Sequence, residues 1–187
     1  MLIDYDVWKN SLLSFSNEIN GLLEFKKNPS IGYGADFITG VISCEYSEFK
    51  NKIFMSQNVI SGNNEAGLSF LIFEDQFENK NKLHLGISQR DFFDKIFFVK
   101  PIKTGNNLFN KKFSVNSSDK AVALNIFSDS KVQDIFLGNS LLVFNILTKA
   151  GIKEVKMKHM GKKLYSCVEM QKALDDFRYI LSKMFKT

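Results

Sequence analysis

Hydrophobic positions recur with a helical period near both ends of the chain. Near the N-terminus the repeating residues are Trp8, Leu12, Phe15, Ile19 and Leu22. Spacings of four and three place them on one side of a helix, and we expect it to end before Asn28-Pro29, because the residue before a proline avoids the α region. The same spacings relate Met170, Leu174, Phe177, Leu181 and Met184 in a C-terminal helix. Both stripes are expected to face the core, with a groove for a partner helix as the alternative.

Between these helices the pattern changes to the period of two that is typical of strands. Residues 37–46 and 49–57 predict a hairpin joined near Ser47-Glu48, and residues 68–73 predict the next strand of an antiparallel meander. Residues 83–85 predict a further short strand. Further along, three strands are predicted at residues 140–148, 152–159 and 162–168.

Residues 104–137 contain the clearest run of strand, turn and helix. A strand is predicted around Phe113 and Val115, and Asp119 lies in the first turn of a helix that ends at Ser128-Asp129. A second helix should begin at Ser130, with Gln133 completing a capping box, and should close at Gly138. Asn106 and Asn110 are expected to satisfy backbone groups rather than to bind a substrate.

The predicted fold class is therefore α+β. Its order is an N-terminal helix, an antiparallel β-meander, then strand, helix, helix, three strands and a C-terminal helix. A length of 187 residues fits one domain, and the change of pattern also suggests two packed subdomains, 1–103 and 104–187.

Charge and composition narrow the classes of partner. The chain has 25 basic residues and a net charge of +5, but only Arg90 and Arg178 are arginines. Recognition of bases and phosphates depends heavily on bidentate arginine, so we expect no nucleic-acid partner. No signal-peptide core and no stretch of about 18 apolar residues is present, which predicts a cytoplasmic protein without an integral membrane segment. Cys44 and Cys167 are expected to be buried free thiols, and no cofactor is predicted.

One pattern of charged residues indicates catalysis. Asp36, Glu48 and Lys50 resemble the carboxylates and lysine with which nucleases of the restriction-endonuclease type hold a divalent metal. The alternative is that Glu48 and Lys50 flank a hairpin turn and point to water. His84 and His159 have no partner at ligand or triad spacing and are expected to be structural.

Phenylalanine is unusually frequent, with 19 copies. The rings of Phe92, Phe93, Phe97 and Phe98, together with Phe70, Phe73 and Phe77, exceed what a small core needs and predict an apolar contact surface. We therefore expect a non-catalytic module for protein interaction or self-association, with a protein partner or a homo-oligomer. A divalent-metal hydrolase and an apolar-ligand carrier are the alternatives.

Two segments resemble a known pattern. The first runs from Gly40-Val41 to Lys52-Ile53; the second comprises Thr104-Gly105-Asn106, Phe109-Asn110, Phe113-Ser114-Val115 and Ser117. They are similar to the G-x-Y-x-G-R-x-V hairpin and the T-G-D-x-x-F-D-x-x-F-x-V-x-S motif of a widespread family of uncharacterised bacterial α+β proteins, over about residues 35–185. Asn106 and Asn110 replace acidic residues of that pattern, and Glu48-Phe49-Lys50 replaces its Gly-Arg turn. The resemblance implies a fold and no activity.

Overall fold

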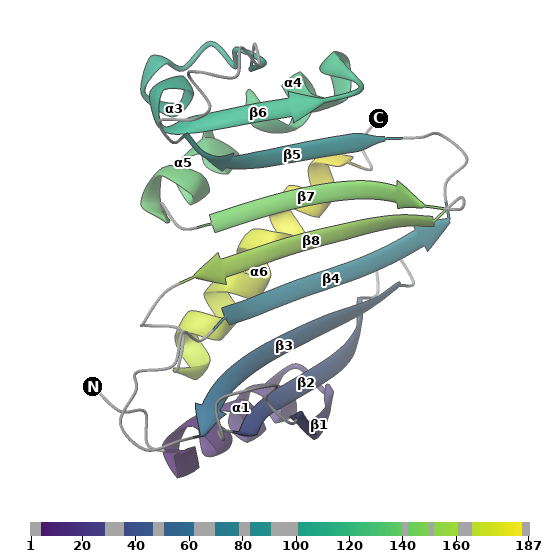
Figure 1. The fold of residues 1–187 in the computed structure, drawn as a ribbon, viewed down its shortest axis with the longest axis vertical. Helices are drawn as coiled ribbons and strands as arrows, with labels where there is room; N and C mark the ends of the chain where they lie inside the picture. The colour runs from purple at the N-terminus through teal and green to yellow at the C-terminus, as the bar shows by residue number, and fades with distance from the viewer. Residues whose placement is uncertain are drawn as a thin grey trace. The chain divides into compact units, whose positions relative to one another are not determined.

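The computed structural model describes residues 5–28, 36–46, 51–61, 70–78, 83–90, 101–139, 142–149, 152–160 and 166–184. The chain divides into two compact units. Figure 1 labels the helices and strands of both. Unit 1 comprises Met1–Asp75 and Lys158–Leu174, and unit 2 comprises Gln76–Met157 and Asp175–Thr187. The division is therefore discontinuous and differs from the halves 1–103 and 104–187 that the sequence suggests.

Unit 1 combines a helix with an antiparallel meander. Helix α1 (Tyr5–Glu18) precedes strands β1 (Leu22–Asn28), β2 (Asp36–Tyr46) and β3 (Asn51–Ser61), and strand β4 (Phe70–Glu78) belongs to unit 1 as far as Asp75. The strand order is β1-β2-β3-β4, and each neighbouring pair is antiparallel. The predicted α+β class, the N-terminal helix and the hairpin of β2 and β3 are confirmed. The hairpin is longer than predicted, because β3 continues through residues 58–61.

Helix α1 is shorter than the hydrophobic stripe predicts. Asn20 adopts the left-handed conformation with φ of 53°, the Gly21 N–H donates to the Ser16 carbonyl, and the Asn20 N–H donates to the Asn17 carbonyl. These two bonds are those of a Schellman motif, which ends a helix. The prediction of helix up to residue 28 is therefore wrong. Trp8, Leu12 and Phe15 are fully buried as expected, whereas Leu22 lies in β1 and is 64% exposed.

Unit 2 is built on antiparallel pairing between strands distant in sequence. Strand β5 (His84–Gln89) pairs with β6 (Phe113–Ser117) on one side and with β7 (Leu142–Lys149) on the other. Strand β8 (Ile152–Met160) lies next to β7 and belongs to unit 2 as far as Met157. Three helices accompany them: α3 (Asn107–Lys112), α4 (Lys120–Phe127) and α5 (Ser130–Gly138). Helix α6 (Cys167–Met184) contributes its residues from Asp175 onward to this unit.

Five phenylalanine rings fill the core of unit 2. Phe109, Phe113, Phe127, Phe136 and Phe144 are at most 2% exposed. The centroid of the Phe109 ring lies 5.2 Å from that of Phe113, and the Phe127 ring lies 5.8 Å from Phe136 and 6.4 Å from Phe144. Contacts at these separations stabilise a core beyond simple burial. Part of the phenylalanine surplus is therefore explained by packing within the unit.

The second half of the chain differs from the sequence prediction at three places. Residues 107–112 form helix α3, begun by the Asn106 cap, which no pattern predicted. Helix α5 is capped by Asp129, whose carboxylate accepts from the Val132 N–H, and not by Ser130. Cys167 and Val168, expected at the end of a strand, are the first residues of α6, and Cys167 is only partly buried.

Candidate interaction surface

Strand β1 is the edge strand of the unit 1 meander. Its residues from Leu22 to Asn28 pair with Ser43 to Phe37 of β2, and among the residues that the structure describes no strand pairs with its other edge. Leu22 is 64% exposed and Phe25 is 37% exposed. An edge strand with open N–H and C=O groups and apolar side chains is a template for pairing with another chain.

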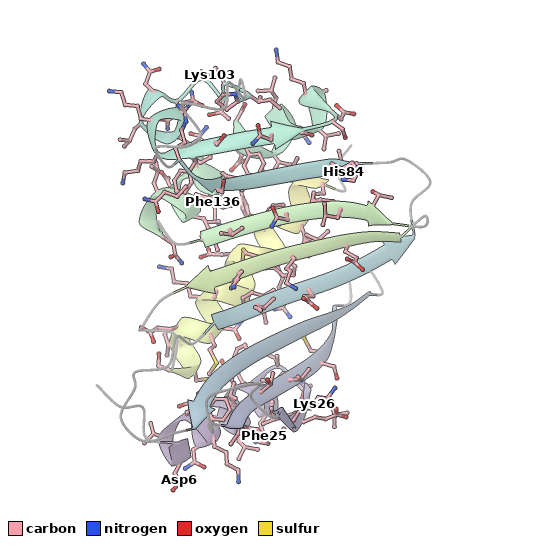
Figure 2. All side chains as sticks on the ribbon, in the orientation of Figure 1. Asp6, Phe25, Lys26, His84, Lys103 and Phe136 are labelled. Carbon is pink, nitrogen blue, oxygen red and sulfur yellow. The ribbon has the colours of Figure 1, made fainter. Side chains whose placement is uncertain are left out.

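Helix α1 supports one face of β1. The Trp8 ring meets the Phe25 ring edge-on at 5.8 Å, so Phe25 points to the side of the sheet on which α1 packs. Phe25 and its neighbour Lys26 are labelled in Figure 2. Gly40 lies opposite Phe25 in β2, and a Cβ at Gly40 would lie 2.5 Å from Leu12 Cδ1. Glycine is therefore required there for the close approach of α1 to the sheet.

The opposite face of β1 carries two charges. Because side chains alternate along a strand, Glu24 and Lys26 lie on the face turned away from α1. Their charged groups are 3.9 Å apart, and their side chains are 59% and 60% exposed. An ion pair this exposed contributes little to the stability of the fold, so both charges are available to a partner.

Exposed apolar side chains are concentrated in unit 1. The large hydrophobic residues that are exposed in the described part of the chain are Val7, Leu13, Leu22, Phe25, Leu108, Leu147 and Val168. Five of these seven belong to unit 1. Single exposed apolar residues are ordinary on a protein surface, but Leu22 and Phe25 share one edge strand. Sequence reasoning missed them because it placed Leu22 in a helix; Asn20-Gly21 is the signal that would have indicated the strand.

Most of the residues that were predicted to carry function lie outside the described part of the chain. Asp36 is the first residue of β2 and pairs with Ser61, whereas Glu48 and Lys50 lie outside the described residues. Phe92, Phe93, Phe97 and Phe98 also lie outside them, as do the side chains of Phe70 and Phe77. Phe73 is fully buried and meets the His159 ring at 6.0 Å, so it belongs to a core and not to a contact surface.

A hydrogen-bonded network in unit 2 joins Thr104, Asn106, Asn110 and Gln133. The Gln133 Nε2 donates to the Phe127 carbonyl at 2.7 Å and to Thr104 Oγ1 at 3.3 Å, and its Oε1 accepts from Asn106 Nδ2 at 2.8 Å. Asn106 Oδ1 also caps α3 by accepting from the Phe109 N–H, and Asn110 Oδ1 accepts from the Thr104 N–H. Asn106 and Asn110 therefore satisfy backbone groups, as predicted.

Two titratable groups in unit 1 are held in their neutral forms. Burial lowers the pKa of His159 to about 4. Burial, a hydrogen bond from its Sγ to Glu18 Oε2 at 2.7 Å and the charge of that carboxylate together raise the pKa of the Cys167 thiol to about 11. A thiol with a raised pKa is a poor nucleophile at neutral pH, because the thiolate is the reactive form.

A charged cluster at the start of α5 stabilises unit 2. The Asp129 carboxylate accepts from the Val132 N–H and from the Tyr179 hydroxyl at 3.1 Å and pairs with Lys183 Nζ. Burial raises the pKa of Asp129, but the hydrogen bonds from Lys183, Val132 and Tyr179 outweigh that effect and lower it. Lys131 Nζ lies 4.1 Å from the centre of the Tyr179 ring. Each of these groups has a structural partner.

No group of three or more His, Cys, Asp or Glu side chains within the described ranges could hold a metal ion. No helix in those ranges is long and apolar enough to cross a membrane. Comparison of the chain with protein-family models, with curated proteins and with solved structures found no match. The resemblance to a bacterial family of unknown function therefore stays a prediction.

Proposed function

We propose that the protein is a non-catalytic interaction module that binds a protein partner through the open edge of β1. The observation that carries this proposal is the exposure of Leu22 and Phe25 on an edge strand that no other described strand covers. Addition of a strand from a partner would satisfy the open backbone groups of β1 and cover part of both side chains.

The protonation states of Cys167, the potential nucleophile, and His159, the potential base, support a role without catalysis. Cys167 is protonated at neutral pH because its pKa is about 11, and His159 is a buried neutral imidazole whose pKa is about 4. General acid–base catalysis near pH 7 favours a pKa close to 7. The polar network around Gln133 is likewise occupied by internal hydrogen bonds.

The proposal is tested by site-specific photo-crosslinking in the cells that produce the protein. A photoreactive amino acid replaces Leu22 on β1 in one variant and Leu147 on β7 in another. Leu147 is a matched control because it is also an apolar strand residue and is 40% exposed. We expect a discrete protein adduct from position 22 and none from position 147. Absence of an adduct from position 22, or the same adducts from both positions, would overturn the proposal.

A further inference from the structure

We propose that the partner is a second copy of this chain, and that the two β1 strands pair antiparallel about a twofold axis at Phe25. This inference rests on the proposed function and specifies its partner. In such a pair, Glu24 faces the partner's Lys26, Lys26 faces the partner's Glu24, and Phe25 faces the partner's Phe25.

The backbone groups at the outer edge of β1 are open, whereas those at the edge of β6 in unit 2 are partly bonded. At the edge of unit 2, the Ile102 N–H donates to the Val115 carbonyl at 2.8 Å, so part of β6 is already occupied. Among the described residues, no equivalent backbone bond to the outer edge of β1 is found. A seven-residue strand pairing with its copy would form about six to eight backbone hydrogen bonds, depending on which residues point outward.

The alternation of an antiparallel ladder limits the register. Along an edge strand, every second residue points its N–H and C=O outward, and such a residue can pair only with a residue of the partner that does the same. A symmetric pair of two β1 strands therefore has its twofold axis at a residue and not between two residues. Centring on Phe25 pairs all seven residues of β1, from Leu22 to Asn28. Moving the centre by one residue places Glu24 opposite the partner's Glu24, or Lys26 opposite the partner's Lys26, and shortens the ladder.

Charge selects the register centred on Phe25. Opposite charges directly across a strand pair stabilise it and like charges destabilise it. Within one chain, the Glu24 carboxylate and the Lys26 ammonium are 3.9 Å apart on one face of β1. The symmetric register adds two contacts of the same kind between the copies, each between a Glu24 and the partner's Lys26. Charges on an edge strand usually prevent pairing; here they exclude the two neighbouring registers and fit the central one.

On the other face, the pair would bring the two Phe25 rings together. Phe25 lies on the α1 side of β1, with Trp8 at 5.8 Å and Lys9 Nζ 5.8 Å from its ring centre. In the twofold pair the two Phe25 rings are direct cross-strand neighbours, and aromatic pairs in this position stabilise a sheet. The 37% of Phe25 that is exposed in the single chain would be partly covered.

Charge reversal provides the test, read by sedimentation equilibrium over a range of protein concentrations. For the unmodified chain we expect the mean mass to rise from 21.4 kDa towards twice that value. Glu24→Lys and Lys26→Glu each create two pairs of like charges, and we expect each to weaken self-association roughly tenfold or more. An equimolar mixture of the two variants should restore it, since every lysine then faces a glutamate. The double variant Glu24→Lys/Lys26→Glu should restore it as well.

Restoration by mixing also shows that both variants are folded. A chain that stays at 21.4 kDa at every concentration would overturn the inference, and so would reversal variants that associate as the unmodified chain does. The photo-crosslink at Leu22 separates the two proposals. An adduct with a different protein supports the proposed function and overturns self-association, whereas no adduct overturns both.

Discussion

The side-chain amide of Gln133 donates to the backbone carbonyl of Phe127 across 2.7 Å, which joins helix α5 to the end of helix α4. Gln133 is 4% exposed, and its amide also bonds Thr104 and Asn106. A buried amide is stable only when its polar atoms have partners, and this one has three. The connection between the helices therefore depends on one polar side chain within an otherwise aromatic core.

Replacing Gln133 with methionine should destabilise unit 2. The substitution keeps the length of the side chain but leaves the Phe127 carbonyl and the Asn106 amide without this partner, and each unsatisfied buried group costs about 1–3 kcal/mol. We expect the free energy of unfolding, measured with urea, to fall by about 2–4 kcal/mol. Asp134→Asn, at the exposed neighbouring position, should change it by less than about 0.5 kcal/mol. Equal effects of the two variants would contradict this account.

Replacing Phe113 tests how much the aromatic cluster contributes to the stability of unit 2. The Phe113 ring lies 5.2 Å from the Phe109 ring and 5.7 Å from the Phe136 ring and is 2% exposed. Removing a buried ring costs about 3–5 kcal/mol, and a buried hydroxyl adds to that cost. We expect Phe113→Ser to lower the urea midpoint strongly. Leu108→Ser, at a residue of the same unit that is 55% exposed, is the control. Normal folding of Phe113→Ser would refute the role of the cluster.

Local patterns predicted the elements that depend on neighbouring residues. The buried stripe of α1, the hairpin of β2 and β3, and helices α4 and α5 follow from periodicity, whereas the N-cap residues of the two helices, Asp119 and Asp129, were not predicted as caps. Periodicity failed at residue 22, because Leu22 continues the helical spacing although the Asn20-Gly21 turn has already ended α1. The two-residue turn overrides the pattern, since a left-handed residue breaks the ladder of helical hydrogen bonds.

The sequence did not indicate which strands distant along the chain pair with one another. Strand β5 lies between β6 and β7, and Leu85 faces Ser117 on one side and Ile146 on the other. A period of two identifies a strand but not its partners, which here are 32 and 61 residues away. The open edge of β1 was missed for another reason, because residues 22–28 were predicted as helix and not as a strand.

His159 should make the stability of the protein depend on pH. Burial lowers the pKa of its imidazole to about 4 from an ordinary value of 6.5. Between these values the unfolded chain binds a proton that the folded chain does not, so the free energy of unfolding decreases as the pH falls from about 6.5 to about 4. A shift of this size corresponds to a loss of about 3 kcal/mol.

The measurement is urea unfolding at several pH values across this window. His159→Met should remove most of the decrease, because methionine has no proton to bind. His84→Ala, at the exposed histidine, should retain it. A slope that His159→Met leaves unchanged would show that other groups control acid unfolding.

The Cys167 thiol should react slowly with alkylating reagents. Its pKa of about 11 lies above the ordinary 9.0, so at pH 8 the thiolate fraction is lower by roughly a hundredfold. The greater intrinsic reactivity of a more basic thiolate compensates in part, which leaves a rate about tenfold lower than that of an ordinary thiol. Glu18→Gln removes the carboxylate charge 2.7 Å from Sγ and should raise the rate several-fold.

Mass spectrometry of the Cys167 peptide after timed alkylation with iodoacetamide measures this rate and separates it from reaction at Cys44. Asp6→Asn, which removes a carboxylate in the first turn of α1, is the control and should not alter the rate. If Glu18→Gln left the rate unchanged, burial alone would account for the raised pKa.

Gly40 determines how closely α1 approaches β1 and β2. A Cβ there would lie 2.5 Å from Leu12 Cδ1, 3.5 Å from Phe25 Cε1 and 3.6 Å from Trp8 Cζ2. We expect Gly40→Ala to lower the free energy of unfolding by about 1–3 kcal/mol, the usual cost of overpacking a core. Gly138→Ala is the matched control, because nothing lies within 4 Å of the added Cβ.

A double-mutant cycle with Leu12→Ala identifies the cause. Leu12→Ala alone should cost about 2–5 kcal/mol because it leaves a cavity. In the Leu12→Ala background the Leu12 Cδ1 atom is absent, so adding Gly40→Ala should lower the free energy of unfolding by almost nothing further. The effects of the two substitutions on that free energy should therefore be non-additive by more than about 0.5 kcal/mol. Strictly additive costs would mean that Gly40 is needed for the backbone of β2 and not for the position of α1.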